Sequence, residues 1–237
     1  MLLVPPEKGL HFSAVRAEEC GLSETYEIKI DKSLFDEVCR MNRYYEEKLP
    51  EGYSETFVID ANDKKQGMGL QAAVIITVAA LVNVFFFIYA LPRLGEIAAG
   101  FTVIKCICFV IAYPLYIVLH ELTHGLVYKL LTGKKLTIGF KPPSAYCGVP
   151  DVYTYRSTSL LSLFAPLTVY SILFVLLFFI INEPFSRTMI LLLFALHLSG
   201  CVGDLYGIGL FLFRFKSPAA LRRDFGPRQV YYTKDCR

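Results

Sequence analysis

The segment HELTH, residues 120–124, places two histidines and a glutamate inside a run of apolar residues. His120 and His124 are four residues apart, so on an α-helix they lie one turn apart on one face and their imidazoles can reach the same ion. Glu121 follows the first histidine, the position from which a carboxylate can take a proton from water held on that ion. The spacing therefore predicts a zinc (Zn²⁺) site with Glu121 as general base.

A catalytic zinc site usually has three protein ligands, so one more ligand must come from elsewhere in the chain. Asp204 lies nine residues before Phe213, where an apolar run ends, and Leu122 lies nine residues before the end of its own run at Leu131. If both runs are helices that point the same way, the two sites share one depth. One carboxylate would also bring zinc, two neutral imidazoles and a hydroxide to formal neutrality, which suits a low-dielectric site. Asp204 is therefore the predicted third ligand.

Two other polar residues precede Asp204 in ALHLSGCVGDLYGIG, residues 195–209. His197 lies two helical turns before Asp204, so it either handles protons near the metal ligands or is an ordinary buried histidine. Cys201 lies one turn away and is expected mainly to pack, with a role as a ligand or beside the ligands left open. The donor that would stabilise an oxyanion has three candidates, Tyr116, Tyr128 and Tyr206.

Hydrophobic residues make up 54% of the sequence and charged residues only 19%, which is more apolar than an ordinary soluble domain. Four runs are long enough to cross a bilayer, at about residues 70–91, 100–131, 159–182 and 188–213. A chain of 237 residues cannot bury four such helices in a soluble core. We therefore expect a mainly α, polytopic integral membrane protein whose four transmembrane helices occupy residues 67–216.

Lysine and arginine near the ends of spans favour the cytoplasmic side of the membrane. The connection between spans one and two has one basic residue, Arg93, and the connection between spans three and four also has one, Arg187. The other flanks are richer in basic residues, including Lys64, Lys65, Lys134, Lys135, Lys141, Arg156, Arg214, Lys216, Arg222 and Arg223. This bias predicts that both termini are cytoplasmic. With a net charge of only +3 and no basic patch interleaved with aromatic residues, nucleic-acid binding is not expected.

The remaining segments are predicted to be cytoplasmic. Residues 1–66 are expected to form a small α+β segment, with strands at 23–31 and 53–60 and a helix from Ser33 to about Lys48. Short extended pieces separated by Gly and Pro predict a β-hairpin at 135–157, between the second and third spans. Residues 217–237 are expected to be a tail. The seven cysteines form neither a CxxC pair nor a disulfide framework, so we expect reduced thiols.

HELTH on the second span, an aspartate in SGCVGDLY on a later span and a hairpin between them resemble the integral-membrane zinc metallopeptidases of the site-2 protease kind. Two further segments, LPEGYSETFVIDANDKK and SLLSLFAPL, are similar to a bacterial family of uncharacterised membrane proteins described as putative zincin peptidases. The resemblance covers about residues 49–213. It implies that His120, His124 and Asp204 bind zinc, that Glu121 is the general base, and that the protein resides in a bacterial cell membrane.

The chain departs from the site-2 protease pattern around the aspartate. Its neighbours are Val202, Gly203 and Leu205, whereas that pattern has an asparagine, a proline and a glycine around the acid. The departure leaves the assignment of the ligand intact. It removes the basis for transferring substrate handling near this helix.

We therefore expect a membrane-embedded zinc metalloprotease that hydrolyses a peptide bond of a membrane protein or peptide, in or next to the bilayer, with Glu121 activating a zinc-bound water. A spanning substrate must unwind, and the hairpin could hold it by β-addition. The alternative is a non-catalytic zinc-binding membrane scaffold or an inactive pseudo-protease, which has no particular use for Glu121. A di-iron membrane oxidase would need more than the four histidines present. Substrate, cleavage position and oligomeric state do not follow from the sequence.

Overall fold

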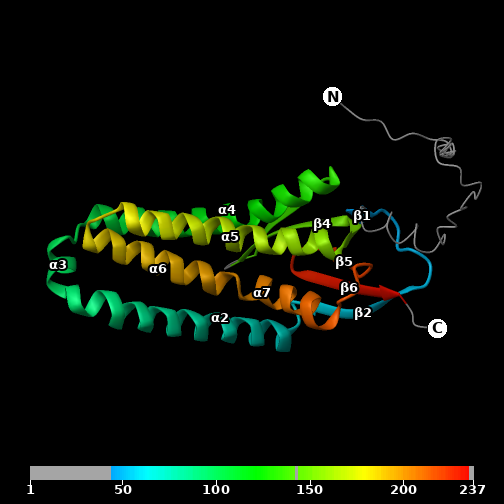
Figure 1. Cartoon of the computed structure of the whole chain (residues 1–237), viewed down its shortest axis with the longest axis horizontal. Coiled ribbons are helices and arrows are strands. Elements are labelled where there is room, and N and C mark those ends of the chain that lie inside the picture. The colour runs from blue at the N-terminus through cyan, green and yellow to red at the C-terminus, as the bar shows by residue number, and fades with distance from the viewer. Residues whose placement is uncertain (1–43, 142–143, 235–237) are drawn as a thin grey trace, which may run out of the picture.

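A computed structural model describes residues 44–141 and 144–234 (Figure 1). The strand expected at 23–31 and most of the helix expected from Ser33 lie outside these residues. The end of that helix was predicted wrongly, because Tyr45–Glu46 is a strand, β1, paired with a strand from the middle of the chain. A two-residue strand has too few side chains to show a periodic pattern, so its partner decides its conformation.

The described residues contain four helical stretches long and apolar enough to cross a membrane: Lys64–Ala99, Val103–Thr132, Arg156–Ile180 and Pro184–Arg214. They match the four expected runs, with ends that differ by up to eight residues. The mainly helical fold with four candidate spans is thus confirmed, whereas insertion and orientation stay predictions.

The first stretch changes its winding along its length. Helix α2 (Lys64–Phe85) begins at Asp63, whose carboxylate accepts hydrogen bonds from the backbone N–H groups of Lys65 and Gln66. It continues through a π-helical turn, a 3₁₀ turn that contains Pro92, and the short helix α3 (Leu94–Ala99). Because proline offers no backbone N–H, it favours this change of winding. Figure 1 places α3 at the end of the bundle farthest from the sheet.

The other helices are α4 (Val103–Thr132), α5 (Arg156–Ile180), α6 (Pro184–Gly200) and α7 (Val202–Gly209). Figure 1 shows α4 and the α6–α7 pair running toward the sheet, while α2 and α5 run away from it. The two segments that carry the predicted ligands therefore have the same direction. Helix α5 packs against both α4 and α6 and holds them together.

The fourth stretch was expected to be one continuous span, but it is interrupted. Helix α6 ends at Gly200, Cys201 lies at the junction, and α7 begins at Val202. The interruption puts Asp204 in the first turn of a new helix. The positive end of the helix dipole favours a carboxylate at that position.

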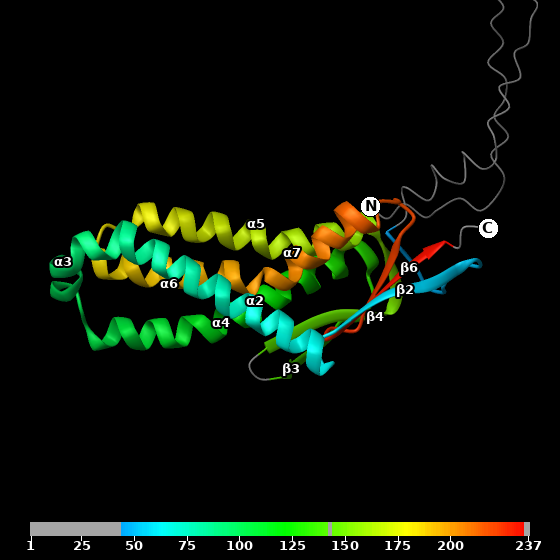
Figure 2. The ribbon, with the colours of Figure 1, turned by 90° about the horizontal axis from the view of Figure 1, so that it is seen from below.

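The sheet is antiparallel and closes one end of the bundle (Figure 2). Its strand order is β1-β4-β5-β6-β2, with β3 paired to the first part of β4. The remaining strands are β2 (Tyr53–Asp60), β3 (Thr137–Lys141), β4 (Ser144–Tyr155), β5 (Leu221–Asp224) and β6 (Arg228–Lys234). The predicted strand at 53–60 and the predicted hairpin, now β3–β4, are confirmed.

The segment expected as a tail, residues 217–237, holds the central strands of this sheet. Strand β5 pairs with β4, and β6 pairs with β2 from Tyr53 opposite Lys234 to Asp60 opposite Arg228. Strand β2 therefore reaches the rest of the sheet only through β6. The aromatic ring of Tyr231 on β6 packs with Phe211 and Phe215 beneath the sheet, so this segment also joins the sheet to the helices.

Candidate metal centre

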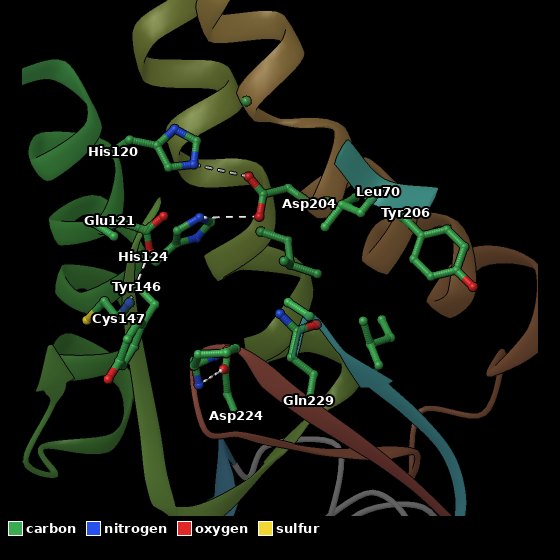
Figure 3. A pocket seen from close by; sticks show the side chains of 18 of the residues that line it. Leu70, His120, Glu121, His124, Tyr146, Cys147, Asp204, Tyr206, Asp224 and Gln229 are labelled. Atoms are coloured by element: carbon green, nitrogen blue, oxygen red, sulfur yellow. Dashed lines mark hydrogen bonds and ion pairs between the residues drawn. The ribbon is translucent and has the colours of Figure 1, made fainter. Parts of the chain in front are cut away.

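The structure brings together the three side chains predicted to bind metal (Figure 3). Nε2 of His120 lies 3.3 Å from Oδ2 of Asp204, and Nε2 of His124 lies 3.3 Å from Oδ1 of the same carboxylate. All three ligand atoms lie within 4.8 Å of one another. Two parallel-running helical segments, 80 residues apart in sequence, thus converge on one point.

The hydrogen bonds of the rings show which nitrogen atoms are free for a cation. Nδ1 of His124 lies 2.8 Å from the backbone carbonyl of Ser162, which can only accept, so Nδ1 carries the proton. In the neutral ring, Nε2 then presents a lone pair to the carboxylate of Asp204. Two acceptors that face each other at 3.3 Å repel unless a proton or a metal ion lies between them, so this position can hold a cation.

The distances also fit the ion that the sequence predicts. Ligand atoms about 2.0–2.1 Å from a tetrahedral zinc ion lie about 3.3 Å from one another. Both histidine–carboxylate separations have this value. In addition, Oδ2 of Asp204 is buried and makes no geometrically acceptable hydrogen bond, which leaves an orphaned acceptor at the centre. The donor set therefore fits zinc.

A buried chain of hydrogen bonds leads away from His120. The Tyr116 hydroxyl lies 2.9 Å from Nδ1 of His120 and 2.7 Å from Nδ1 of His197. Nε2 of His197 continues to the hydroxyl of Ser171, 3.1 Å away. Ligand atoms of His120, His197 and Cys201 also lie within 4.8 Å of one another. Because Tyr116 hydrogen-bonds both rings, hydrogen bonds account for this second grouping. The rings of His197 and His120 also meet edge to face, with centroids 6.4 Å apart.

The hairpin positions Glu121. The backbone N–H of Cys147, on β4, donates to Oε2 of Glu121 across 3.0 Å. Gly125 allows this approach, because a Cβ at that position would lie only 2.6 Å from Sγ of Cys147. Burial raises the pKa of the Cys147 thiol to about 11, so at neutral pH the thiol stays protonated. The backbone N–H of Cys147 is the group that contacts Glu121.

These side chains share one cavity of about 310 Å³ (Figure 3). It is bounded by residues of α2, α4 and α7, by the β3–β4 hairpin and by the turn between β5 and β6. Besides the predicted site residues, its lining includes Leu70, Gln71, Tyr128, Ala145, Tyr146, Cys147, Tyr206, Arg222, Asp224 and Gln229.

Sequence reasoning missed two charged residues of this wall. Arg222 is only 1% exposed and Asp224 only 4%, and Nη2 of Arg222 donates to Oδ2 of Asp224 across 2.8 Å. In the sequence, Arg222 counted only as a basic residue after the last span. The one feature of the sequence that could have indicated this pair is the spacing of Arg222 and Asp224 in LRRD, which puts both side chains on one face of a strand. Four residues are too few to predict a strand that faces a cavity.

The structure supports none of the three tyrosines as oxyanion donor. The hydroxyl of Tyr116 is engaged with two histidines, and that of Tyr128 donates to Asp224 across 3.1 Å. Figure 3 shows the hydroxyl of Tyr206 pointing away from Asp204.

Comparison with known proteins gives one family match over the part of the chain that carries this site. A family model described as "Putative zincin peptidase" matches residues 113–219, which include HELTH, the hairpin and Asp204. No curated protein and no solved structure matches the chain significantly. Residues 113–219 of the chain therefore match the model of a family described as putative zincin peptidases.

Proposed function

We propose that the chain is a zinc-dependent peptidase that hydrolyses a peptide bond in or next to the membrane. His120, His124 and Asp204 hold the metal, and Glu121 is the general base. One observation carries the proposal: three ligand atoms lie within 4.8 Å of one another on the wall of a cavity that also holds Glu121. The family match supports the peptidase class, and the four apolar helices support the location.

A zinc ion in this site supplies a Lewis acid that activates water and polarises the scissile carbonyl. Glu121 takes one proton from the attacking water and later gives it to the leaving nitrogen, so the carboxylate ends as it began. The N–H of Cys147 holds Oε2 of this carboxylate, which leaves Oε1 for the proton. Asp204 and the two imidazoles face one another and would hold the ion in the same cavity as Glu121.

One edge of strand β4 beside the cavity is available to an extended peptide. Strand β4 pairs with β3 from Ser144 to Gly148, and its pairing with β5 begins only at Val149. The opposite edge of the first part of β4 therefore faces Glu121, as the N–H of Cys147 does. A substrate unwound from a membrane helix must satisfy its backbone groups again, and such an edge can pair with it.

Glu121→Gln is the decisive variant. It keeps the size of the side chain and should leave zinc bound, whereas cleavage of fluorescein-labelled β-casein in detergent should fall by about 100-fold or more, since a lost general base costs that much. Glu96→Gln, at the far end of the bundle in α3, is the matched control and should cleave as the wild type does. If zinc-loaded Glu121→Gln protein cleaves normally, Glu121 is not the general base. If zinc-loaded wild-type protein does not cleave, the site is a scaffold and not a peptidase.

A further inference from the structure

Arg222 is a buried cation whose hydrogen bonds are incomplete. Its side chain lines the cavity beside the metal centre, and the residue is only 1% exposed. Nη2 donates to Asp224, but Nε and Nη1 have no hydrogen-bond partner. Unpaired donors of a buried charged group are costly, because the group loses its water without a replacement. An acceptor therefore belongs next to these two nitrogen atoms.

Asp224 does not supply the missing acceptor. Its carboxylate already accepts from Arg222, from the hydroxyl of Tyr128 across 3.1 Å and from the backbone N–H of Gly226 across 2.8 Å. These contacts fix the carboxylate, and the carboxylate fixes the guanidinium. Near it, the hydroxyl of Tyr231 is also buried without a partner. This part of the protein has more donors than acceptors, so a bound ligand should bring an oxygen atom.

The charges of the cavity wall indicate whether this oxygen belongs to a carboxylate or to a carbonyl group. The carboxylates that line it are those of Glu121, Asp204 and Asp224, and the guanidinium is that of Arg222. With a divalent zinc ion and neutral imidazoles, these charges balance. A carboxylate ligand would leave a net negative charge in a buried place, which is unfavourable, whereas a carbonyl oxygen adds no charge.

We propose, resting on the peptidase function above, that Arg222 binds a main-chain carbonyl oxygen of an extended, internal segment of the substrate. A peptide drawn into this cavity loses the partners of its own carbonyls, and Nε and Nη1 of Arg222 provide replacements. The substrate class is then an internal stretch of polypeptide and not a free C-terminus, so the enzyme does not act as a carboxypeptidase. Arg222 acts as a substrate-binding residue, and Asp224 positions it.

The test measures peptide binding without cleavage, in zinc-loaded Glu121→Gln protein in detergent. The probe is an N-acetylated octapeptide of alternating Ala and Leu, made as the C-terminal amide and as the free acid. Both forms should bind about equally. Adding Arg222→Lys keeps the positive charge beside Asp224 but removes donors, and should weaken both by about tenfold or more, the effect of one lost hydrogen bond to a charged group.

Arg223→Lys is the matched control, because Arg223 lies on the same strand but donates to the carbonyl of Pro150 and to Tyr153. It should bind both peptides as the parent does. Arg222→Gln serves as a second variant if Arg222→Lys does not fold, and zinc content is measured for each protein.

Two results would overturn the inference. If zinc-loaded Arg222→Lys protein binds the amide as tightly as the parent, the guanidinium contacts only water. If the parent prefers the free acid by tenfold or more and Arg222→Lys abolishes that preference, the ligand is a carboxylate. Failure of the proposed function is a different result: protein with intact Glu121 and bound zinc would then not cleave β-casein, whatever residue occupies position 222.

Discussion

The hydroxyl of Tyr116 lies 2.9 Å from Nδ1 of His120, one helical turn away on α4. The same hydroxyl lies 2.7 Å from Nδ1 of His197. A hydroxyl has one proton, so it accepts from one ring and donates to the other. If Nε2 of His120 is to bind a metal, Nδ1 of that ring carries the proton, Tyr116 accepts it, and Tyr116 donates to His197. Nε2 of His197 then donates to Ser171, and every group in the chain has a partner.

Removing this hydroxyl should loosen the metal site without abolishing it. Tyr116→Phe deletes the group that orients His120, and such outer contacts are worth about 10–100-fold in metal affinity. We expect zinc to bind about tenfold more weakly and the absorption spectrum of the cobalt-substituted protein to change. Tyr113→Phe, one turn earlier on α4, is the control and should do neither. Wild-type affinity and spectrum in Tyr116→Phe would show that the hydroxyl only fills space.

The assignment of Asp204 can be tested by metal content alone. Asp204→Asn removes a charged ligand, so we expect zinc affinity to fall by at least about 100-fold, more than loss of an outer contact costs. Competition with a chelator of known affinity measures this. Asp151→Asn changes an exposed aspartate of β4 outside the cavity and should bind zinc normally. Equal affinity in the two variants would remove Asp204 from the site.

The contact between Gly125 and Cys147 predicts a compensating pair of substitutions. Gly125→Ala puts a methyl group 2.6 Å from Sγ of Cys147, so it should push β4 away from Glu121 and reduce cleavage of β-casein. Cys147→Ala alone keeps the backbone N–H that Glu121 uses and should cleave within about twofold of the wild type, as most substitutions that keep the key group do. The double variant should recover most of the activity, because the clash is gone.

Loss of activity in Cys147→Ala would contradict this account and give the sulfur a role. Failure of the double variant to recover would mean that the methyl group clashes chiefly with Leu136, whose Cδ1 lies 3.0 Å from the same point. Both outcomes are read from initial rates at equal zinc content.

Glu183 predicts how stability depends on pH. Glu183 is the N-terminal cap of α6, and its carboxylate accepts hydrogen bonds from the hydroxyl of Ser186, from Lys105 and from two backbone N–H groups. These hydrogen bonds, that of Ser186 first, lower the pKa of Glu183 from 4.5 to about 2. A depressed pKa means that the stabilisation is complete above the unfolded value and is lost as pH falls from about 4.5 toward 2. Wild type should therefore exceed Glu183→Gln in midpoint of thermal unfolding by about 2 °C at pH 6, since the group is partly exposed.

The difference between the two proteins should shrink as the pH is lowered below 4.5. Thermal unfolding followed by intrinsic tyrosine fluorescence in detergent measures it. A difference that stays constant from pH 6 to 3 would show that the cap stabilises the helix without its charge.

The part of the site that rests on one helix could be predicted from the sequence. His120, Glu121 and His124 are fixed relative to one another by the 3.6-residue period of α4, so their spacing alone places them on one face. Asp204 could be predicted as the third ligand because it lies as far from the end of its span as HELTH does from the end of its own, provided that the two spans run in the same direction. The apolar runs gave the four helices because a span must be continuous in hydrophobicity over about 20 residues.

Other features had no such local signature. The break at Cys201 leaves both flanking segments equally apolar, so hydropathy does not register it. The pairing of β6 with β2 joins segments that begin 175 residues apart, from Tyr53 to Arg228, and no short-range pattern specifies a partner at that distance.

The sequence by itself determined the helices, the hairpin and the residues that can bind a metal, because each depends on neighbours within a few turns of chain. Only the tertiary structure decided that Asp204 faces both imidazoles, that the N–H of Cys147 holds Glu121, and that Arg222 shares their cavity. These contacts depend on how α4, α7 and the sheet pack together. Packing is set by the shapes of many side chains at once, which no single spacing in the sequence records.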